Sequence, residues 1–463
     1  MPLKFFDPLT TVPRGAPHTL CCTIALLFAT NGLLSGCAVS PIDAATSTET
    51  ESTAATSAWW REFNDPLLDQ LIKQAMQANP SIASSQAALR QARAVRDVKL
   101  AASRPSLTVS GSVQRSTADN TPASISFRSG LDARWELDVF GANRSAVANS
   151  EADLAVAKSN LRDVQLSMTA EVALAYIQLR GLQAQLGIAE RNLSSQAETL
   201  QITQWREQAG LVTSLEVEQA KAAVAQTSAQ RPALQSSMAK ARHSLAVLTG
   251  QSPKTLDATL QMVQAMPKVP LHVANEIAAD ALRQRADVRA AEERITAALA
   301  AVSAAEAARK PSFRLGGSVG LTALTLTGLS NGAALASQIL ASVSVPLLDG
   351  GGAIAQVRVQ QAALAQTRAA YTSTVLAALK EVEDALVALQ NDKERFTYLQ
   401  QAAEAADHAA LLAQNRYSSG LIDFQTVLQT QRTLLSAQDS ATSLQADLSS
   451  DHVRLIKAMG GGW

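Results

Sequence analysis

Cysteine is almost missing from this chain of 463 residues. Its three cysteines, Cys21, Cys22 and Cys37, all lie within the first 37 positions, so the rest of the chain has neither a disulfide framework nor a cysteine-based metal site. The histidines show no metal-ligand spacing, and we interpret them as isolated, solvated residues on helix surfaces: His18, His243, His272, His408 and His452. We therefore expect no metal and no other cofactor.

An excess of charge of one sign is also missing, because Lys+Arg and Asp+Glu both number 40. A nucleic-acid partner is therefore not expected. We expect no Ser/His/Asp arrangement and no Gly-x-Ser-x-Gly nucleophile elbow, so the protein is predicted not to be an enzyme. A secreted hydrolase is an alternative. Aromatic residues make up only 4% of the chain, whereas apolar residues make up 47% and are largely alanine. This composition favours long helices.

The first 36 residues have the composition of an export signal. Lys4 and Arg14 precede the apolar run LCCTIALLFATNGLL, which is too short to span a membrane stably. The run ends in LSGC at 34–37, which resembles the bacterial lipobox, so we expect cleavage before Cys37 and lipid attachment to that residue. A retained membrane anchor is the alternative. The Ser/Thr/Ala-rich residues that follow predict a lipidated, flexible tether over 37–58.

The body of the chain contains an internal duplication. RPSLTVSGSV at 104–113 recurs as KPSFRLGGSV at 310–319, and AGLVTSLEVEQA at 209–220 recurs as SGLIDFQTVLQT at 419–430. The first pair is 206 positions apart (310 − 104) and the second is 210 apart (419 − 209). We therefore expect two repeats of one unit, over residues 59–265 and 266–463.

Each repeat is predicted to contain a helix, a strand hairpin, a very long helix, a turn and a returning helix. The predicted helices are 80–103, 142–209 and 213–249 in the first repeat, and 287–309, 353–419 and 423–459 in the second. Between 142 and 209 there is no proline, so this helix would reach on the order of 100 Å. Heptad spacing predicts coiled-coil seams along Val172, Leu179, Leu186, Leu193 and Leu200, and along Val382, Leu389, Phe396, Ala403 and Ala410.

The predicted hairpins span about 105–140 and 311–349, and their strands alternate between apolar and polar residues. In the first hairpin, strands over about 106–114 and 125–140 are joined by a polar loop, RSTADNTPAS at 115–124. In ISFRSGLDARWELDV (125–139), Leu131 and Trp135 fall on one parity, and Asp132 and Arg134 on the other. Strands of this length can cross a bilayer when tilted, and the alternation suits a barrel with lipid outside and water inside. Four strands cannot close alone in lipid, so we expect several chains to pool their strands. A soluble sandwich is the alternative.

In the order of its motifs and in its internal duplication, the chain resembles the outer-membrane factor family, the TolC-like efflux lipoproteins of the OprM/NodT type. The segments that carry the resemblance are LSGC, WWREFNDPLLDQLI at 59–72, WELDVFG at 135–141, PLLDGG at 346–351 and the two Gly-Leu turns. The resemblance implies a mainly α protein with a membrane β part. Three chains would form a 12-stranded outer-membrane β-barrel, continuous with a periplasmic α-helical coiled-coil barrel.

The resemblance also implies a function and a location. The protein would be the passive outer-membrane duct of a tripartite efflux system in a Gram-negative bacterium. It would be a homotrimer, with outer-membrane lipid, a periplasmic adaptor (membrane fusion protein) and an inner-membrane pump as partners. A coiled-coil lipoprotein that spaces the envelope is the alternative, although it gives no role to the strand hairpins.

The candidate functional residues lie at the two turns between the long helices. Exposed leucines beside the glycines would contact the adaptor, and the expected contact residues are Gly210, Leu211, Val212, Gly420, Leu421 and Ile422. Many family members have aspartates just inside this tip, where the present chain has Thr426 and Gln429. Glu216 and Asp423 lie nearby and are candidates for a pore constriction, although solvated helix charges are an open alternative. The family's PLLDGG motif is usually followed by Arg, and here by Gly352.

Overall fold

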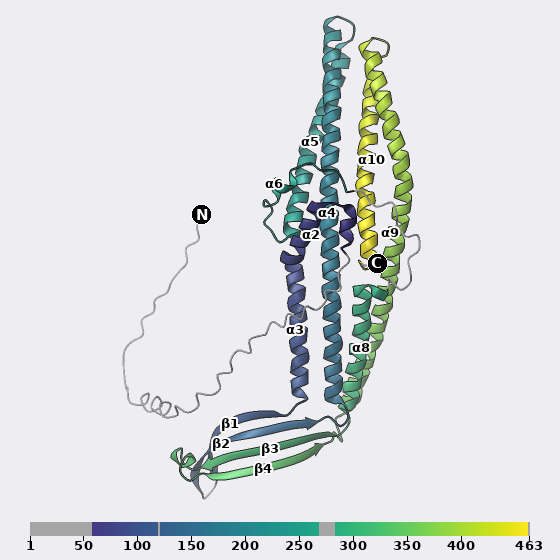
Figure 1. Ribbon diagram of the computed structural model, residues 1–463. Helices are drawn as coiled ribbons and strands as arrows, with labels where there is room; N and C mark the ends of the chain where they lie inside the picture. Colours follow the sequence, from purple (N-terminus) through teal and green to yellow (C-terminus); the bar gives the residue numbers. More distant parts are fainter. Residues whose placement is uncertain (1–57, 119–120, 268–282, 462–463) are drawn as a thin grey trace, which may run out of the picture. The chain divides into compact units, whose positions relative to one another are not determined.

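The computed structural model describes residues 58–118, 121–267 and 283–461. The expected signal segment, Cys37 and almost all of the tether lie outside the described residues. The elements in chain order (Figure 1) are η1 Trp59–Phe63, α2 Pro66–Ala78, α3 Pro80–Ala102, β1 Ser106–Ala118, β2 Thr121–Leu137, α4 Ala142–Gln208, α5 Ser214–Leu248, α6 Asp257–Leu260, α8 Ala286–Ala307, β3 Ser312–Ala323, η2 Thr327–Leu329, β4 Ala334–Ser344, α9 Gly352–Ser418 and α10 Phe424–Ala458.

Two helix starts near the amino end of the described chain follow from side-chain caps. Asp65 accepts hydrogen bonds from the backbone N–H groups of Leu67 and Leu68 at 2.9 and 3.1 Å, and Pro66 opens α2. Asn79 caps α3 in the same way. The predicted helix over 80–103 corresponds to α3, but α2, which precedes it, was not predicted from the sequence. The Asp-Pro pair inside WWREFNDPLLDQLI is the signal for that helix.

The long helices of the two repeats have equal lengths. Helices α4 and α9 each contain 67 residues, and α5 and α10 each contain 35. A helix of 67 residues extends about 100 Å. Helix α4 contacts α3, α5, α8 and α10, and α9 contacts α8 and α10, so α4 is flanked by helices of both repeats.

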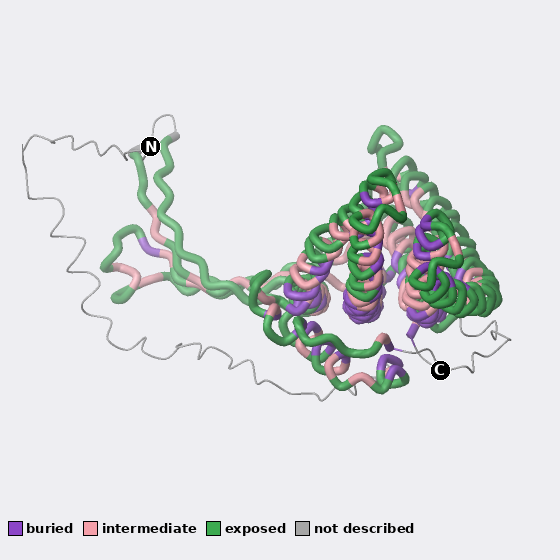
Figure 2. The backbone as a smooth tube through the Cα atoms, turned by 90° about the horizontal axis from the view of Figure 1, so that it is seen from above, coloured by how far each residue is buried: buried purple, intermediate pink, exposed green. Residues whose placement is uncertain are grey.

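The main hydrophobic core lies where η1 and α2 cross the middle of the long helices. Its fully buried members include Leu68, Ile72, Tyr176, Ile177 and Leu245. In Figure 2 the buried residues gather on the facing sides of the helices, whereas the strands are drawn almost wholly as exposed or intermediate. The sheet therefore contributes little to this core.

The predicted seam of α4 is fully buried near the core and only partly buried toward the turn. Val172 and Leu179 are fully buried, whereas Leu186, Leu193 and Leu200 are only partly buried. The buried residues in that half of the helix are mostly polar: Asn192, Gln196, Thr199 and Thr203. In α9, Val382, Leu389 and Ala410 are buried, while Phe396 and Ala403 are partly exposed. Helix α4 has neighbours on two sides in this region. Leu200 packs toward a cluster that contains residues of α5, and polar residues such as Thr199 form the contact with α10.

The four strands form one antiparallel sheet in the order β1-β2-β3-β4. The register places Leu131 opposite Val109 and Val319, and Asp132 opposite Thr108 and Ser318. Two predicted details are wrong. The polar segment 115–124 is not all loop, because β1 continues to Ala118 and β2 begins at Thr121, and β4 ends at Ser344 rather than near residue 349. Polar residues can extend these strands because their side chains meet no apolar core.

Candidate channel wall and helical tips

The polar face of the sheet is defined by the strand register. Residues paired across neighbouring strands share a face, and this face carries small hydroxyl, amide, glycine and alanine residues and Leu340 between its charged side chains. The charged residues are Arg128, Asp132, Arg134, Glu136 and Arg314. The Ser110 hydroxyl donates to Asp132 Oδ2 over 2.6 Å, and Arg314 Nε lies 3.4 Å from Glu136 Oε2. Such a surface suits contact with water.

The opposite face is apolar and uncovered. Val109 is 81% exposed and Ile339 is 85% exposed, although both are aliphatic. Trp135 lies on the same face, and its indole N–H donates to the carbonyl of Ser103 over 3.2 Å. This contact ties the end of β2 to the end of α3. An apolar surface of this extent requires a hydrophobic environment, and its alternation with the polar face fits a strand between lipid and water.

Both edges of the sheet are open within one chain. Strands β1 and β4 are the outer strands, so each has one row of backbone N–H and C=O groups without a sheet partner. Such groups must be paired in hydrocarbon, because no water is available to them there. The sheet can therefore enter a membrane only if strands of other chains continue it.

Equivalent acidic residues join the sheet to the long helix in each repeat. Asp138 accepts hydrogen bonds from the N–H groups of Asn143 and Arg144 at 3.0 and 2.8 Å. Asp349 accepts from Gly351 and Ala353 at 2.9 and 2.7 Å. These contacts satisfy free N–H groups at the starts of α4 and α9. The WELDVFG and PLLDGG motifs are thus transitions from strand to helix.

The two helical tips have the same turn geometry. Gly210 has φ 72° and Gly420 has φ 77°, a region that glycine adopts without a steric penalty. The N–H groups of Leu211 and Leu421 donate to the carbonyls of Arg206 and Arg416 at 2.8 and 2.9 Å, which completes a Schellman-type helix end. Leu211 is 68% exposed and Leu421 is 73% exposed. The side chain that packs inward is instead Ile422, against the cluster around Phe424.

Polar contacts join the two coiled-coil pairs near these tips. Gln431 Nε2 on α10 donates to Thr199 Oγ1 on α4 over 2.9 Å, and the hydroxyls of Thr203 and Tyr417 lie 3.1 Å apart. Arg206 donates to the carbonyl of Tyr417 over 2.7 Å and lies over its ring. Hydrophobic periodicity cannot detect such a seam. The buried polar residues recur at heptad spacing, at 192 and 199 and at 196 and 203, but this spacing alone does not distinguish them from a solvated helix face.

A family model for outer membrane efflux proteins matches residues 71–251 and 277–461. The chain belongs to this family. The efflux protein is 32% identical over 421 residues to the pyoverdine export outer membrane protein OpmQ of Pseudomonas putida, covering 88% of each chain. It is 31% identical over 413 residues to nodulation protein T of Rhizobium leguminosarum bv. viciae, covering 88% of this chain and 85% of that protein.

Solved structures agree with this assignment. The outer-membrane channel OprN superposes with a TM-score of 0.83 at 34% identity, over 88% of this chain and 92% of that chain. VceC from Vibrio cholerae gives a TM-score of 0.81 at 28% identity, over 87% and 98% of the two chains. The efflux protein is accordingly the trimeric outer-membrane channel of a Gram-negative tripartite efflux system, which pairs with an adaptor and an inner-membrane pump. These relatives do not support the envelope-spacing alternative.

Three of the candidate constriction residues of the efflux protein lie at the starts of α5 and α10: Glu216, Asp423 and Thr426. Glu216 accepts from the Thr213 N–H over 2.7 Å, and Asp423 accepts from the N–H and hydroxyl of Thr426 at 2.8 and 2.6 Å. These hydrogen bonds from Thr426 lower the pKa of Asp423. Both acids therefore cap helices. At the offset of 210 between the repeats, Thr213 corresponds to Asp423 and Glu216 corresponds to Thr426, so the acid and the threonine exchange positions. The remaining candidate, Gln429, is exposed on α10.

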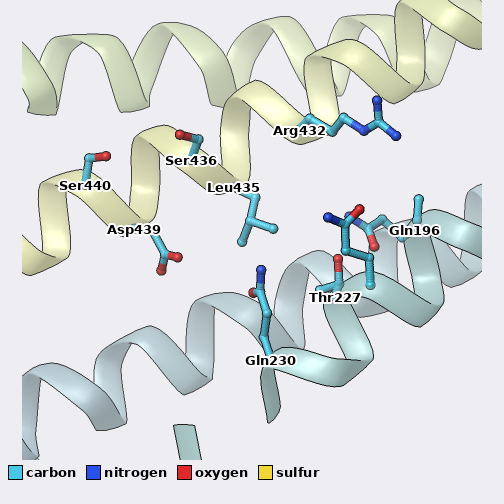
Figure 3. A pocket seen from close by; sticks show the side chains of 10 residues that line it. Gln196, Thr227, Gln230, Arg432, Leu435, Ser436, Asp439 and Ser440 are labelled. Carbon is cyan, nitrogen blue, oxygen red and sulfur yellow. The ribbon is translucent and has the colours of Figure 1, made fainter. Parts of the chain in front are cut away.

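A polar groove of about 760 Å³ runs between α5 and α10, with Gln196 of α4 at its floor (Figure 3). Thr227 and Gln230 line it from α5, and Arg432 and Asp439 line it from α10. Burial raises the pKa of Asp439. Among the described residues, no group of three or more His, Cys, Asp or Glu side chains could hold a metal ion. Within the same ranges, no helix is both long and apolar enough to cross a membrane.

Two sequence interpretations need correction. His452 is 6% exposed rather than solvated, and its ring packs edge-on against Phe63. Its Nε2 lies 3.4 Å from Glu62 Oε2, and burial lowers the pKa of His452. The expectation of no Gly-x-Ser-x-Gly pattern is also wrong, because residues 316–320 match it. Ser318 lies inside β3, paired on both sides, rather than on the strand-to-helix turn of a nucleophile elbow.

Proposed function

We propose that the efflux protein is a passive duct whose adaptor docks on six helical tips, two from each chain. The proposed contact residues are Gly210, Leu211, Val212, Gly420, Leu421 and Ile422. The observation that carries the proposal is the exposure of the Leu211 and Leu421 side chains at the two glycine turns. Exposed apolar side chains on a well-formed turn favour a protein contact.

The duct catalyses no reaction in this proposal, and the pump selects the cargo. Relatives of similar length carry names that refer to pyoverdine export and to toluene efflux. Because related chains serve such different compounds, we infer that the wall of the channel has low specificity. The cargo of this chain is therefore proposed to be small organic molecules delivered by its pump.

The proposal extends to the amino-terminal segment and to the pore. Residues 1–36 act as the lipoprotein signal, Cys37 carries the lipid anchor, and residues 37–58 form the tether. Residues 59–265 and 266–463 are the two repeats. In the trimer, Glu216, Asp423, Thr426 and Gln429 surround the narrowest level of the periplasmic pore. The placement of Glu216, Asp423 and Thr426 at the starts of α5 and α10, beside the tips, supports this assignment.

Replacing both Leu211 and Leu421 by Asp tests the docking site. We expect the double variant to lose pump-dependent export of a fluorescent dye in cells that lack other outer-membrane channels. The turns themselves should persist, because Gly210 and Gly420 are unchanged. Leu324→Asp is the matched control, because Leu324 is equally exposed at 72% but lies between β3 and β4.

Two further measurements separate docking from folding. A trimer that shifts on boiling in a gel must be present for every variant, and crosslinking to the adaptor must fall only for the tip variant. Export that continues at the wild-type rate with unchanged crosslinking would show that these tips are not the docking site.

A further inference from the structure

The charges on the polar face of the sheet are confined to its two central strands. Among the described strand residues, β1 and β4 contribute only Ser, Thr, Gln, Ala and Leu to this face, whereas β2 and β3 contribute all the charged groups. Three arginines and two acids give a net charge of +1 per chain (3 − 2). In a trimer, the membrane section would carry a net charge of +3 (3 × 1) on this face.

The acids on this face are engaged, but two of the arginines are not. Asp132 accepts the hydroxyl of Ser110, and Glu136 pairs with Arg314. Arg128 and Arg134 are exposed and form no ion pair within the described residues. A guanidinium group without a carboxylate partner keeps its full attraction for anions and can contact a carboxylate or phosphate through two parallel hydrogen bonds.

Most of the residues around these two arginines on the polar face have short side chains. Arg134 lies opposite Ser106 and Gly316, and between the two arginines Gly130 lies directly opposite Gly320. The strands approach so closely there that a Cβ on Gly130 would come within 2.8 Å of the Val319 carbonyl oxygen. Arg128 and Arg134 are six positions apart, which is about 20 Å along a strand. Asp132 is the other residue of β2 between the two arginines on this face, and the short residues around Gly130 leave each guanidinium accessible to a dissolved anion.

We propose that Arg128 and Arg134 form two rings of guanidinium groups that make the membrane section of the channel prefer anions. The preferred solutes carry carboxylate or phosphate groups and pass from one ring to the next. This inference rests on the proposed duct, since only a closed trimer brings the polar faces around a common lumen. Because the Debye length is about 8 Å at physiological salt, the rings favour passage without tight binding, as conduction requires.

Ion selectivity of the purified trimer in planar bilayers tests the proposal. Under a KCl gradient, the zero-current potential gives the chloride-to-potassium permeability ratio of the whole channel, in which Glu216 and Asp423 at the tips act in series with the arginine rings, so the test is the change in this ratio between variants. In the double variant Arg128→Gln with Arg134→Gln, the chloride-to-potassium permeability ratio should fall by about threefold or more, since the fixed charge that selects between the ions is removed. Asp132→Asn should raise the ratio. Arg115→Gln is the matched control, because Arg115 pairs with Ile125 on the apolar face, and its ratio should not change.

A second measurement tests whether the two arginines act in the membrane section of the channel. Inorganic tripolyphosphate added on the side of the strand loops should reduce the wild-type conductance and have little effect on the double variant. If the double variant conducts with an unchanged ratio and an unchanged block, the arginine rings play no part in selectivity and the inference is wrong. If the wild-type trimer gives no conductance under any condition, the duct itself is refuted and the inference falls with it.

Discussion

Placing an arginine on the lipid-facing side of the sheet should destabilise the trimer by an amount that depends on depth. Leu131 lies in the middle of the sheet, opposite Val109 and Val319 on the apolar face, and an arginine near the bilayer midplane costs about 2–4 kcal/mol. Three copies per trimer make this about 6–12 kcal/mol for Leu131→Arg. Trp135 lies near the helices, bonded to Ser103, so Trp135→Arg should cost only about 0–1 kcal/mol per chain for its interfacial charge.

The matched control is Ser318→Arg. Ser318 lies on the polar face directly opposite Asp132, so its arginine would be hydrated and could pair with that acid. Urea titrations of the trimer in lipid vesicles, followed by the boil-sensitive gel shift, should rank the variants as Leu131→Arg, then Trp135→Arg, with Ser318→Arg close to wild type. Equal losses for Leu131→Arg and Ser318→Arg would refute the assignment of the two faces.

Two further predictions concern other parts of the chain. Cys37→Ala should block lipid attachment and leave a misprocessed precursor while the trimer still assembles, and a mature wild-type protein whose mass spectrum shows no acyl chains would contradict the lipoprotein assignment. The buried His452 should make stability depend on pH: its folded pKa is lowered, so the unfolded state gains the proton more readily, and stability should fall as the pH drops below about 6.5. His452→Gln should reduce the acid-induced loss of stability measured by tryptophan fluorescence between pH of about 7.5 and 5, and an equally steep loss in that variant would show that other groups are responsible.

The sequence was sufficient for features that leave a periodic signal. Alternation over two residues separated the Trp135 face from the Arg134 face, because side chains of a strand point to opposite sides in turn. The glycines at 210 and 420 marked the turns because the chain reverses there through a conformation that favours glycine. These features depend on local backbone geometry, and the register confirms the two strand faces.

Features that depend on contacts between distant helices could not be predicted in the same way. The buried stripe of Thr199 and Thr203 does not differ from a solvated face until α10 supplies Gln431 as a partner. The spacing of Thr213 and Glu216 is that of a capping box, so a capping role for Glu216 could be predicted. An acidic residue is equally suited to a pore constriction, so the residue type alone does not separate the two roles. Burial of His452 depends on η1, a five-residue segment whose docking against α10 no local pattern indicates.

The equal length of α4 and α9 places a constraint on how this chain can change. Each helix has 67 residues, so the two tips of a chain end the same number of turns from the sheet. A single insertion would rotate every later residue by about 100° and raise the tip by about 1.5 Å, and seven residues inserted in α4 alone would raise it by about 10 Å. Alternate tips of the trimer would then end at two levels. Lengthening of this channel, as in a bacterium with a wider periplasm, therefore requires matched insertions in both halves of the gene.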